Sequence, residues 1–159
     1  MPQWLTVLCI VGGALAAVVL SIPFVVSTWV VEGDSMAPTL HAGERIVINK
    51  LAGDPSLGDV IVHRVVTPGG RRHDYVKRVV AVGGDTVSYL DCVLHRNGSA
   101  VDEPYVLDAL GSCGGDLDEL VVPDGHVTVL GDNRADSVDS RVYGPIPNAD
   151  VAGTLWFRL

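Results

Sequence analysis

The chain has 159 residues, with 11 Lys and Arg residues against 19 Asp and Glu residues, which gives a formal net charge of −8. This length suits one compact domain of roughly 100 to 150 residues. A net-negative chain without a run of basic residues does not complement a phosphate backbone, so we expect no nucleic-acid partner.

The N-terminal segment is apolar. No charged side chain precedes Glu32, and residues 4–31 form a stretch of 28 positions without a charge. A helix over residues 4–22 would span about 28 Å, close to the roughly 30 Å hydrocarbon thickness of a bilayer. We therefore predict one transmembrane helix that ends before Pro23, followed by an interfacial stretch over residues 24–31.

Two further points concern the apolar segment: whether it is a cleaved signal peptide, and on which side of the membrane the following domain lies. A cleaved signal peptide is the alternative, but the apolar stretch exceeds the roughly 7 to 15 residues of an h-region and lacks a basic n-region. The side of the membrane is not decided by charge, because residues 1–3 offer only the α-amino group while Arg45 and Lys50 follow the helix. We predict two parts, an anchor with its interfacial segment over residues 1–31 and a second domain over residues 32–159.

We predict that residues 32–159 form an all-β domain. Short runs rich in β-branched residues alternate with Gly, Pro, Asn and Asp, and no helical period of useful length interrupts them. The predicted fold is mainly β, an antiparallel sheet domain preceded by one transmembrane helix. Strands are predicted over residues 45–49, 60–66, 75–82, 86–90, 93–96, 126–130 and 151–157.

Three cysteines and five histidines limit the metal and redox chemistry. Cys9 falls in the apolar segment and is expected to be a small buried side chain. Cys92 and Cys113 pair if the domain faces an oxidising compartment and stay reduced otherwise, and the sequence leaves both states open. Because there is no CxxC pair and the histidines lack metal-ligand spacing, we expect neither a metal nor a cofactor.

A search for catalytic motifs leaves three polar stretches punctuated by glycine. The chain has no Walker A loop, no GxGxxG, no HExxH and no complete GxSxG. What remains is GDSMAPTL at 33–40, YVKRVV at 75–80 and GDNRADSVDSR at 131–141.

These stretches offer a serine and a lysine that suit each other chemically. A serine hydroxyl such as that of Ser35 is a weak nucleophile and needs a base. Lys77 lies in an apolar run whose burial would lower its pKa from about 10.4 toward 8, at a cost of roughly 3 kcal/mol. Strand alternation places Tyr75 and Lys77 on one face and Arg78 on the other.

Other interpretations of these residues compete with a catalytic Ser35 and Lys77. A serine in a Gly- and Pro-bounded loop is usually a turn residue, and a lysine on a strand is usually solvated. Asp139 and Arg141, two residues apart, are typical of a structural ion pair. His63 or His73 is the alternative base for Ser35, although neither lies in one of the three stretches.

Four segments in order resemble the conserved boxes of type I signal peptidases, the membrane-bound serine proteases with a Ser/Lys dyad. They are GDSMAPTL directly after the apolar segment, GDVIVHRVV at 58–66, YVKRVVAVGGD at 75–85 and GDNRADSVDSRVYG at 131–144. VLHRNGSAVDEPYV at 93–106 is also similar, so the resemblance covers nearly the whole chain. A short chain with one anchor resembles the Gram-positive branch of the family.

The resemblance implies a role for individual residues. Ser35 is expected to be the nucleophile and Lys77 the general base, with Ser137 orienting the lysine. Asp139 and Arg141 are expected to form a supporting ion pair. The residues expected to line pockets for small substrate side chains are Val31, Met36, Leu40, Tyr75 and Val76.

The resemblance also implies an oxyanion hole and a cellular setting. The hole would use the Ser35 backbone N–H, and Gly33 stands where some relatives supply a serine hydroxyl, so a second donor is absent or is a backbone N–H or water. The implied partners are exported preproteins with A-x-A signal peptides and membrane lipid. The implied location is the plasma membrane, with one span and the catalytic domain on the extracytoplasmic side.

The sequence leaves two alternative functions to be weighed against a signal peptidase. One is a Ser/Lys protease of the self-cleaving repressor type, which carries a soluble DNA-binding segment where this chain has an apolar one. The other is a membrane-tethered β-domain that binds a protein partner without catalysis. The presence of Ser35, Lys77 and Ser137 together favours the protease.

Overall fold

The computed structural model describes residues 10–11, 25–67, 69–106 and 113–159. The transmembrane helix expected over residues 4–22 falls outside these ranges, apart from Ile10 and Val11. Across the described ranges, the helices are too short or too polar to traverse a bilayer.

The described chain forms two antiparallel sheets. The strands of the larger sheet are β1 (Val26–Val30), β2 (Arg45–Asn49), β3 (Val60–Val66), β4 (Arg72–Val82), β9 (His126–Leu130), β10 (Ile146–Pro147) and β11 (Val151–Arg158). Those of the smaller sheet are β5 (Thr86–Leu90), β6 (Val93–Arg96), β7 (Ser99–Ala100) and β8 (Leu117–Val121). The helical elements are the short turns η1 (Arg134–Asp136) and η2 (Asn148–Asp150) and the single-turn helix α2 (Ser140–Tyr143).

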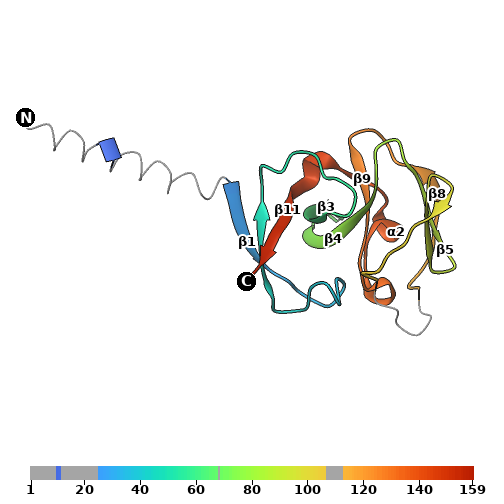
Figure 1. Ribbon diagram of the computed structural model, residues 1–159, viewed down its shortest axis with the longest axis horizontal. Helices are drawn as coiled ribbons and strands as arrows, with labels where there is room; N and C mark the ends of the chain where they lie inside the picture. The colour runs from blue at the N-terminus through green and yellow to red at the C-terminus, as the bar shows by residue number, and fades with distance from the viewer. Residues whose placement is uncertain (1–9, 12–24, 68, 107–112) are drawn as a thin grey trace, which may run out of the picture.

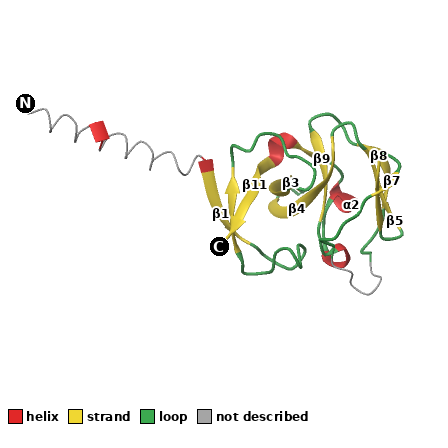
Figure 2. Cartoon of the chain, in the orientation of Figure 1, coloured by secondary structure: helices red, strands yellow, loops and turns green. Residues whose placement is uncertain are grey.

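The order of the strands places the two sheets at opposite ends of the domain. The larger sheet runs β1-β2-β11-β3-β4-β9-β10 and the smaller runs β7-β6-β5-β8. Figure 1 shows β1 and β11 at one end, β5 and β8 at the other, and β3, β4 and β9 between them. Helix α2 lies between β9 and the strands of the smaller sheet (Figure 2).

The predicted fold class is confirmed for this β-domain. Five predicted strands have the observed bounds, β4 begins three residues earlier than expected, and β11 ends one residue later. Strand β1 differs from the expectation, because residues 26–30 were assigned to the membrane interface and instead pair with β2 in the sheet. Its apolar sequence is continuous with the preceding segment, so hydropathy alone does not separate the two.

Strand β4 connects the two cores that flank the larger sheet. Its first half pairs with β3, and its second half pairs with β9, with a register shift between Val79 and Ala81 within this second pairing. On one face Val76 packs against the cluster that includes Val31 and Met36, and on the other Val79 packs with Ile61. A residue in the middle of β4 is therefore removed from solvent on both sides.

Candidate active site

Ser35 and Lys77 are in contact at β4, an interior strand of the larger sheet. Ser35 lies in the loop that follows β1, and Lys77 lies in the centre of β4, where its side chain is 2% exposed. Lys77 Nζ is 2.7 Å from Ser35 Oγ and donates a second hydrogen bond of 2.8 Å to the Val76 carbonyl. The two residues that the sequence paired by chemistry are thus in direct contact.

The surroundings of Lys77 favour its neutral form. Burial lowers the pKa of the Lys77 amine to about 8, against opposing effects of Asp139 and Asp132 that raise it. Burial does this because an ammonium loses the hydration it has in water, whereas a neutral amine loses little. A useful fraction of Lys77 is therefore unprotonated at mildly alkaline pH.

The segment after β9 holds the serine loop by its backbone. Asn133 N–H donates to the Ser35 carbonyl at 3.1 Å, and the Asn133 side-chain amide donates to the Asp34 carbonyl at 3.2 Å. In the described part of the chain nothing accepts a hydrogen bond from the Ser35 N–H. The amide beside the hydroxyl is left available to a ligand.

Gly131 makes this close approach sterically feasible. A Cβ at this position would stand 2.6 Å from the Ser35 carbonyl oxygen and 2.2 Å from Ser137 Oγ, distances that real Cβ atoms do not show. The sequence marked the stretch 131–141 as polar and Gly-punctuated, but the packing role of Gly131 follows only from the fold.

Ser137 is close to the expected position but does not make the expected contact. Its Oγ is buried and, among the described residues, has no hydrogen-bond partner. The bond expected between Ser137 and Lys77 is therefore not formed in this structure. The hydroxyl packs against Gly131 instead, on the side of that residue that also faces the Ser35 carbonyl.

Asp139 and Arg141 form the ion pair that the sequence suggested. Arg141 Nε and Nη2 each donate to the Asp139 carboxylate at 2.8 Å, and the Asp139 side chain is fully buried. Gly131 N–H donates to the same carboxylate at 2.9 Å. Burial raises the pKa of Asp139, but the hydrogen bonds from Arg141 and Gly131 outweigh it, so the pKa is lowered and the carboxylate stays charged.

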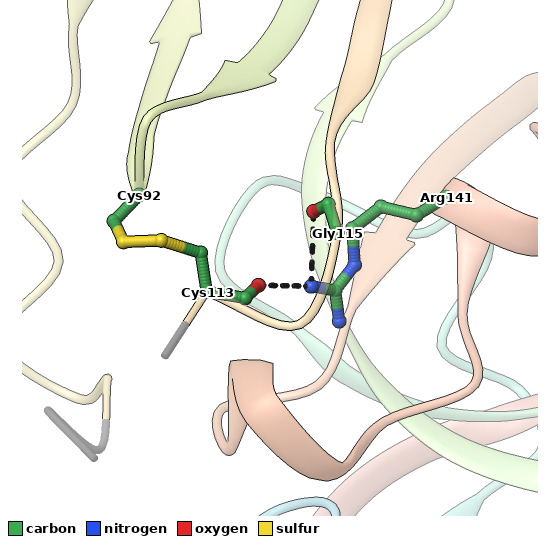
Figure 3. Close-up of a disulfide and its surroundings, with 4 residues drawn as sticks. All are labelled: Cys92, Cys113, Gly115 and Arg141. Carbon is green, nitrogen blue, oxygen red and sulfur yellow. Dashed lines mark hydrogen bonds between the residues drawn. A yellow bond between two sulfur atoms is a disulfide. The ribbon is translucent and has the colours of Figure 1, made fainter. Parts of the chain in front are cut away.

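Arg141 also reaches the smaller sheet. Its Nη1 donates to the Cys113 carbonyl at 2.6 Å and to the Gly115 carbonyl at 3.4 Å, as Figure 3 shows. Cys113 is joined to Cys92 by a disulfide with 4.9 Å between the Cα atoms. Of the two redox states that the sequence left open, the structure has the oxidised one. The guanidinium is therefore held between Asp139 and a covalently braced loop.

A second buried ion pair was not predicted from the sequence. Arg78 Nε and Nη2 donate to Asp132 at 2.9 and 2.7 Å, and Asp132 is 0% exposed. Thr39 also donates to Asp132. These contacts tie the end of the serine loop to β4 and to the segment after β9. The sequence shows a polar residue, Asp132, shortly after a predicted strand. This observation does not identify Arg78 as the partner of Asp132.

A cleft of about 340 Å³ opens beside the Ser35–Lys77 contact. Four of the five expected pocket residues line it, namely Val31, Met36, Tyr75 and Val76. Leu40 differs, because it is 1% exposed in the core and lines a separate groove with Leu155 and Phe157. A backbone hydrogen bond from Leu40 N–H to the Met36 carbonyl places Leu40 one turn farther along the loop from Ser35.

Neither alternative histidine contacts Ser35. His63 is completely buried, its Nε2 lies 3.1 Å from the Tyr143 hydroxyl, and burial lowers its pKa to about 4. His73 is exposed and lines the outer part of the cleft. Among the residues with described positions, Lys77 is the basic group bonded to the serine hydroxyl.

Comparisons with known proteins show what the chain is similar to. The model of the family described as signal peptidase, peptidase S26, matches residues 3–159. A signal peptidase I from Bacillus caldolyticus is 40% identical over 153 residues, which cover 85% of this chain and 80% of the relative. A signal peptidase IB from Staphylococcus aureus (strain Mu50) is 37% identical over 169 residues, covering 94% and 86%.

A solved structure is also similar. The crystal structure of a signal peptidase I from Enterococcus faecalis V583 shares 33% sequence identity with a TM-score of 0.50, covering 64% of this chain and 97% of that one. The family match extends over nearly all of the sequence, and the two relatives are matched over most of their own length. The chain belongs to the signal peptidase family, peptidase S26, a family of serine endopeptidases.

Proposed function

We propose that this chain is a signal peptidase I that removes signal peptides from exported preproteins, with Ser35 as nucleophile and Lys77 as general base. The observation that carries the proposal is the 2.7 Å contact between Ser35 Oγ and Lys77 Nζ beside the cleft. A buried amine with a pKa of about 8 accepts a proton at mildly alkaline pH, which a solvated lysine does not.

The reaction follows from this contact. Neutral Lys77 takes the proton of the Ser35 hydroxyl as Oγ attacks the scissile carbonyl carbon. The resulting ammonium then protonates the nitrogen of the leaving amine, so that the C–N bond breaks and the mature N-terminus departs. The signal peptide remains as an ester on Ser35. Lys77, neutral again, takes a proton from water as the water attacks the ester carbon. It returns that proton to Ser35 Oγ as the bond between the acyl carbon and Oγ breaks, and the signal peptide leaves with a new C-terminal carboxyl group.

Negative charge on the carbonyl oxygen needs a hydrogen-bond donor. We assign the Ser35 N–H, because the described residues leave this amide without an acceptor and it lies next to the nucleophile. Gly33 contributes no side-chain donor. The hole therefore depends on the backbone, whose position is fixed by the hydrogen bonds of Asn133 to the serine loop.

The ion pair beneath the site has a supporting role in this proposal. Asp139 receives two side-chain hydrogen bonds from Arg141 and one from Gly131 N–H, and Gly131 packs against the Ser35 carbonyl. The pair thereby fixes the segment that carries Ser137. We assign Ser137 as the hydroxyl that orients the Lys77 amine once substrate is bound, since its buried Oγ has no other partner among the described residues.

The cleft suits a peptide with small side chains before the cut. Its lining near Ser35 is formed by Val31, Met36, Tyr75 and Val76. Val31 and Met36 are buried apolar side chains beside the nucleophile, a lining that suits a small apolar substrate side chain such as alanine. This supports preproteins with A-x-A sequences as the substrates.

We also propose that residues 1–31 tether the enzyme to the plasma membrane by a single span and that the catalytic domain lies on the extracytoplasmic side. The uncharged stretch from residue 4 to residue 22 is long enough to cross. The Cys92–Cys113 disulfide suits an oxidising compartment. A tethered enzyme meets substrates anchored in the same membrane by their own signal segments, together with lipid, at high effective concentration.

The test is cleavage of a purified preprotein by the full chain in detergent micelles. Ser35→Ala and Lys77→Met are each expected to abolish cleavage, because one removes the nucleophile and the other the base. Matched controls are Ser99→Ala and Lys50→Met, both at exposed positions, which are expected to cleave like the parent chain. Cleavage retained by Ser35→Ala or Lys77→Met would refute the assignment.

The non-catalytic alternative has a distinct outcome in the same assay. A tethered β-domain that only binds a partner leaves the preprotein intact in every variant, the parent chain included. A fluorogenic peptide with an A-x-A sequence provides an independent readout, because it reports catalysis without requiring insertion of the preprotein into micelles.

A further inference from the structure

Three aromatic rings pack behind the lysine of the proposed dyad. Tyr75 shares a face of β4 with Lys77, and Lys77 Nζ lies 5.5 Å from the centroid of the Tyr75 ring. The Tyr75 ring stacks against Tyr143, with centroids 6.0 Å apart and planes at 22°. His63 completes the group, with centroids 6.0 Å from Tyr75 and 5.7 Å from Tyr143. The amine thus lies beside the Tyr75 ring, which packs against Tyr143 and His63 and also stacks on His73, with centroids 6.1 Å apart.

One hydrogen bond holds this set together. The Tyr143 hydroxyl lies 3.1 Å from His63 Nε2 and joins α2 to β3. His63 is 0% exposed, and its Nδ1 has no hydrogen-bond partner in the described part of the chain. Burying an imidazole with an unpaired nitrogen costs free energy that an apolar side chain would not cost. Hydrophobic packing alone therefore does not account for a histidine here.

Helix α2 presents Tyr143 from a fixed support. At its start Asp139 is bonded to Arg141 and to Gly131 N–H. In its first turn the Ser140 hydroxyl accepts a hydrogen bond of 2.9 Å from Val129 N–H of β9. The His63 contact then fixes the end of the helix. The bonds at the start of α2 hold its backbone, and the His63 contact sets where the Tyr143 ring lies against Tyr75.

We propose that His63 and Tyr143 are positioning residues for Lys77, which act through the Tyr75 ring. This inference rests on the proposed role of Lys77 as general base. Their hydrogen bond keeps Tyr143 stacked on Tyr75, and the Tyr75 ring closes one side of the amine against water and directs Nζ toward Ser35. Neither residue touches Ser35 in the structure, so the effect on the reaction is transmitted by packing.

The charges around His63 are consistent with a neutral ring. The titratable groups that face it are Lys77, Asp74 and Tyr75 from β4, and Asp139 and Tyr143 at the two ends of α2. Burial and Lys77 lower the pKa of His63 to about 4, against Asp74 and Asp139. The imidazole is uncharged wherever Lys77 titrates, so the pair shapes the site without adding a second positive charge.

The principal test is Tyr143→Phe in the full chain, which removes a single oxygen and leaves the ring. We expect kcat to fall by about 3- to 10-fold, the factor that corresponds to one neutral hydrogen bond, with KM within about 2-fold of the parent. Water that gains access to Nζ stabilises the ammonium, so the midpoint of the alkaline rise in kcat should move to higher pH.

Two substitutions of His63 provide an independent measurement. His63→Gln keeps a polar atom near the position of Nε2, whereas His63→Leu does not. We expect His63→Gln to retain more of kcat than His63→Leu. The double variant with Tyr143→Phe and His63→Leu should lose no more than either single variant, because both remove the same bond.

The matched control is Tyr89→Phe, which removes a buried tyrosine hydroxyl from the core of the smaller sheet. The inference is overturned if Tyr143→Phe gives the kcat and pH midpoint of Tyr89→Phe, or if His63→Leu and His63→Gln are equal. Lys77→Met, assayed in parallel, distinguishes failure of the proposed dyad from failure of the positioning role. If that variant cleaves, the proposed dyad is wrong. If it is inactive while Tyr143→Phe is unchanged, only the positioning role fails.

Discussion

Gly131 and the carbonyl of Ser35 lie so close that a single methyl group does not fit between them. A Cβ on Gly131 would stand 2.6 Å from that oxygen and 2.2 Å from Ser137 Oγ. The backbone after β9 and the serine loop therefore pack directly on each other. This contact transmits the position of the Asp139–Arg141 pair to the nucleophile.

Gly131→Ala is expected to displace the serine loop. Because the neighbouring atoms are backbone on one side and a buried side chain on the other, one of them must move, and overpacking of this kind costs about 1 to 3 kcal/mol. We expect cleavage of the preprotein to fall by more than 10-fold. Gly69→Ala is the control, since its Cβ would meet nothing within 4 Å. Equal activity of the two variants would contradict this account of the contact.

The pH dependence of cleavage is expected to follow Lys77. The base must be neutral, so kcat/KM should rise with pH and level off above about 8, the pKa to which burial lowers this amine. Well below that pH each unit should lower the rate about tenfold, because the neutral fraction falls by that factor. A pH–rate profile measures this directly. A midpoint near 6.5 would indicate a histidine instead.

Lys77 is also expected to reduce the stability of the fold. Its pKa is lowered from 10.5 in the unfolded chain to about 8 in the folded domain, so below about pH 8 both states carry the proton and the folded one is penalised. The penalty is about 3 kcal/mol and disappears as pH rises from about 8 to 10.5. Lys77→Met should therefore raise the free energy of unfolding at neutral pH and less at about pH 10.

Urea unfolding at the two pH values checks this prediction. Arg71→Met is the control, because that arginine is exposed and its replacement should change stability little at either pH. A Lys77→Met variant that is less stable than the parent at neutral pH would show that the amine is not penalised by burial. The substitution would then have removed favourable contacts.

Most strands were predictable because their hydrophobic runs end at turn residues. The bounds of β2, β3, β5, β6 and β9 follow from such punctuation. Strand β1 was not predictable in this way, since its apolar residues continue a longer apolar stretch and its pairing with β2 is a tertiary property. The short strands β7 and β10 have two residues each, too few for any period to be read.

The residues of the candidate site also differ in whether the sequence alone predicts them. Ser35 and Lys77 were candidates on chemical grounds, a hydroxyl that needs a base and a lysine in an apolar run, and their assignment came from the resemblance of four ordered segments to type I signal peptidases. The partnership of Arg78 with Asp132 joins residues 54 positions apart, and no local pattern specifies it. The contact between His63 and Tyr143 spans 80 positions and has the same character. Contacts between distant polar residues require the strand order to be known.

The buried pair of Asp139 and Arg141 is expected to be far more important for stability than a surface pair. Arg141→Met removes the two side-chain hydrogen bonds of Arg141 to the fully buried Asp139 carboxylate and the hydrogen bond of Arg141 to the Cys113 carbonyl. Breaking a buried ion pair on one side costs about 3 to 5 kcal/mol. Arg64→Met is the matched control, because its pair with Asp74 is solvent-exposed and worth about 0 to 1 kcal/mol. Urea unfolding of both variants measures the difference. Equal losses would mean that the Asp139 carboxylate is protonated or hydrated in the folded domain, and that Arg141 does not hold the segment behind the cleft.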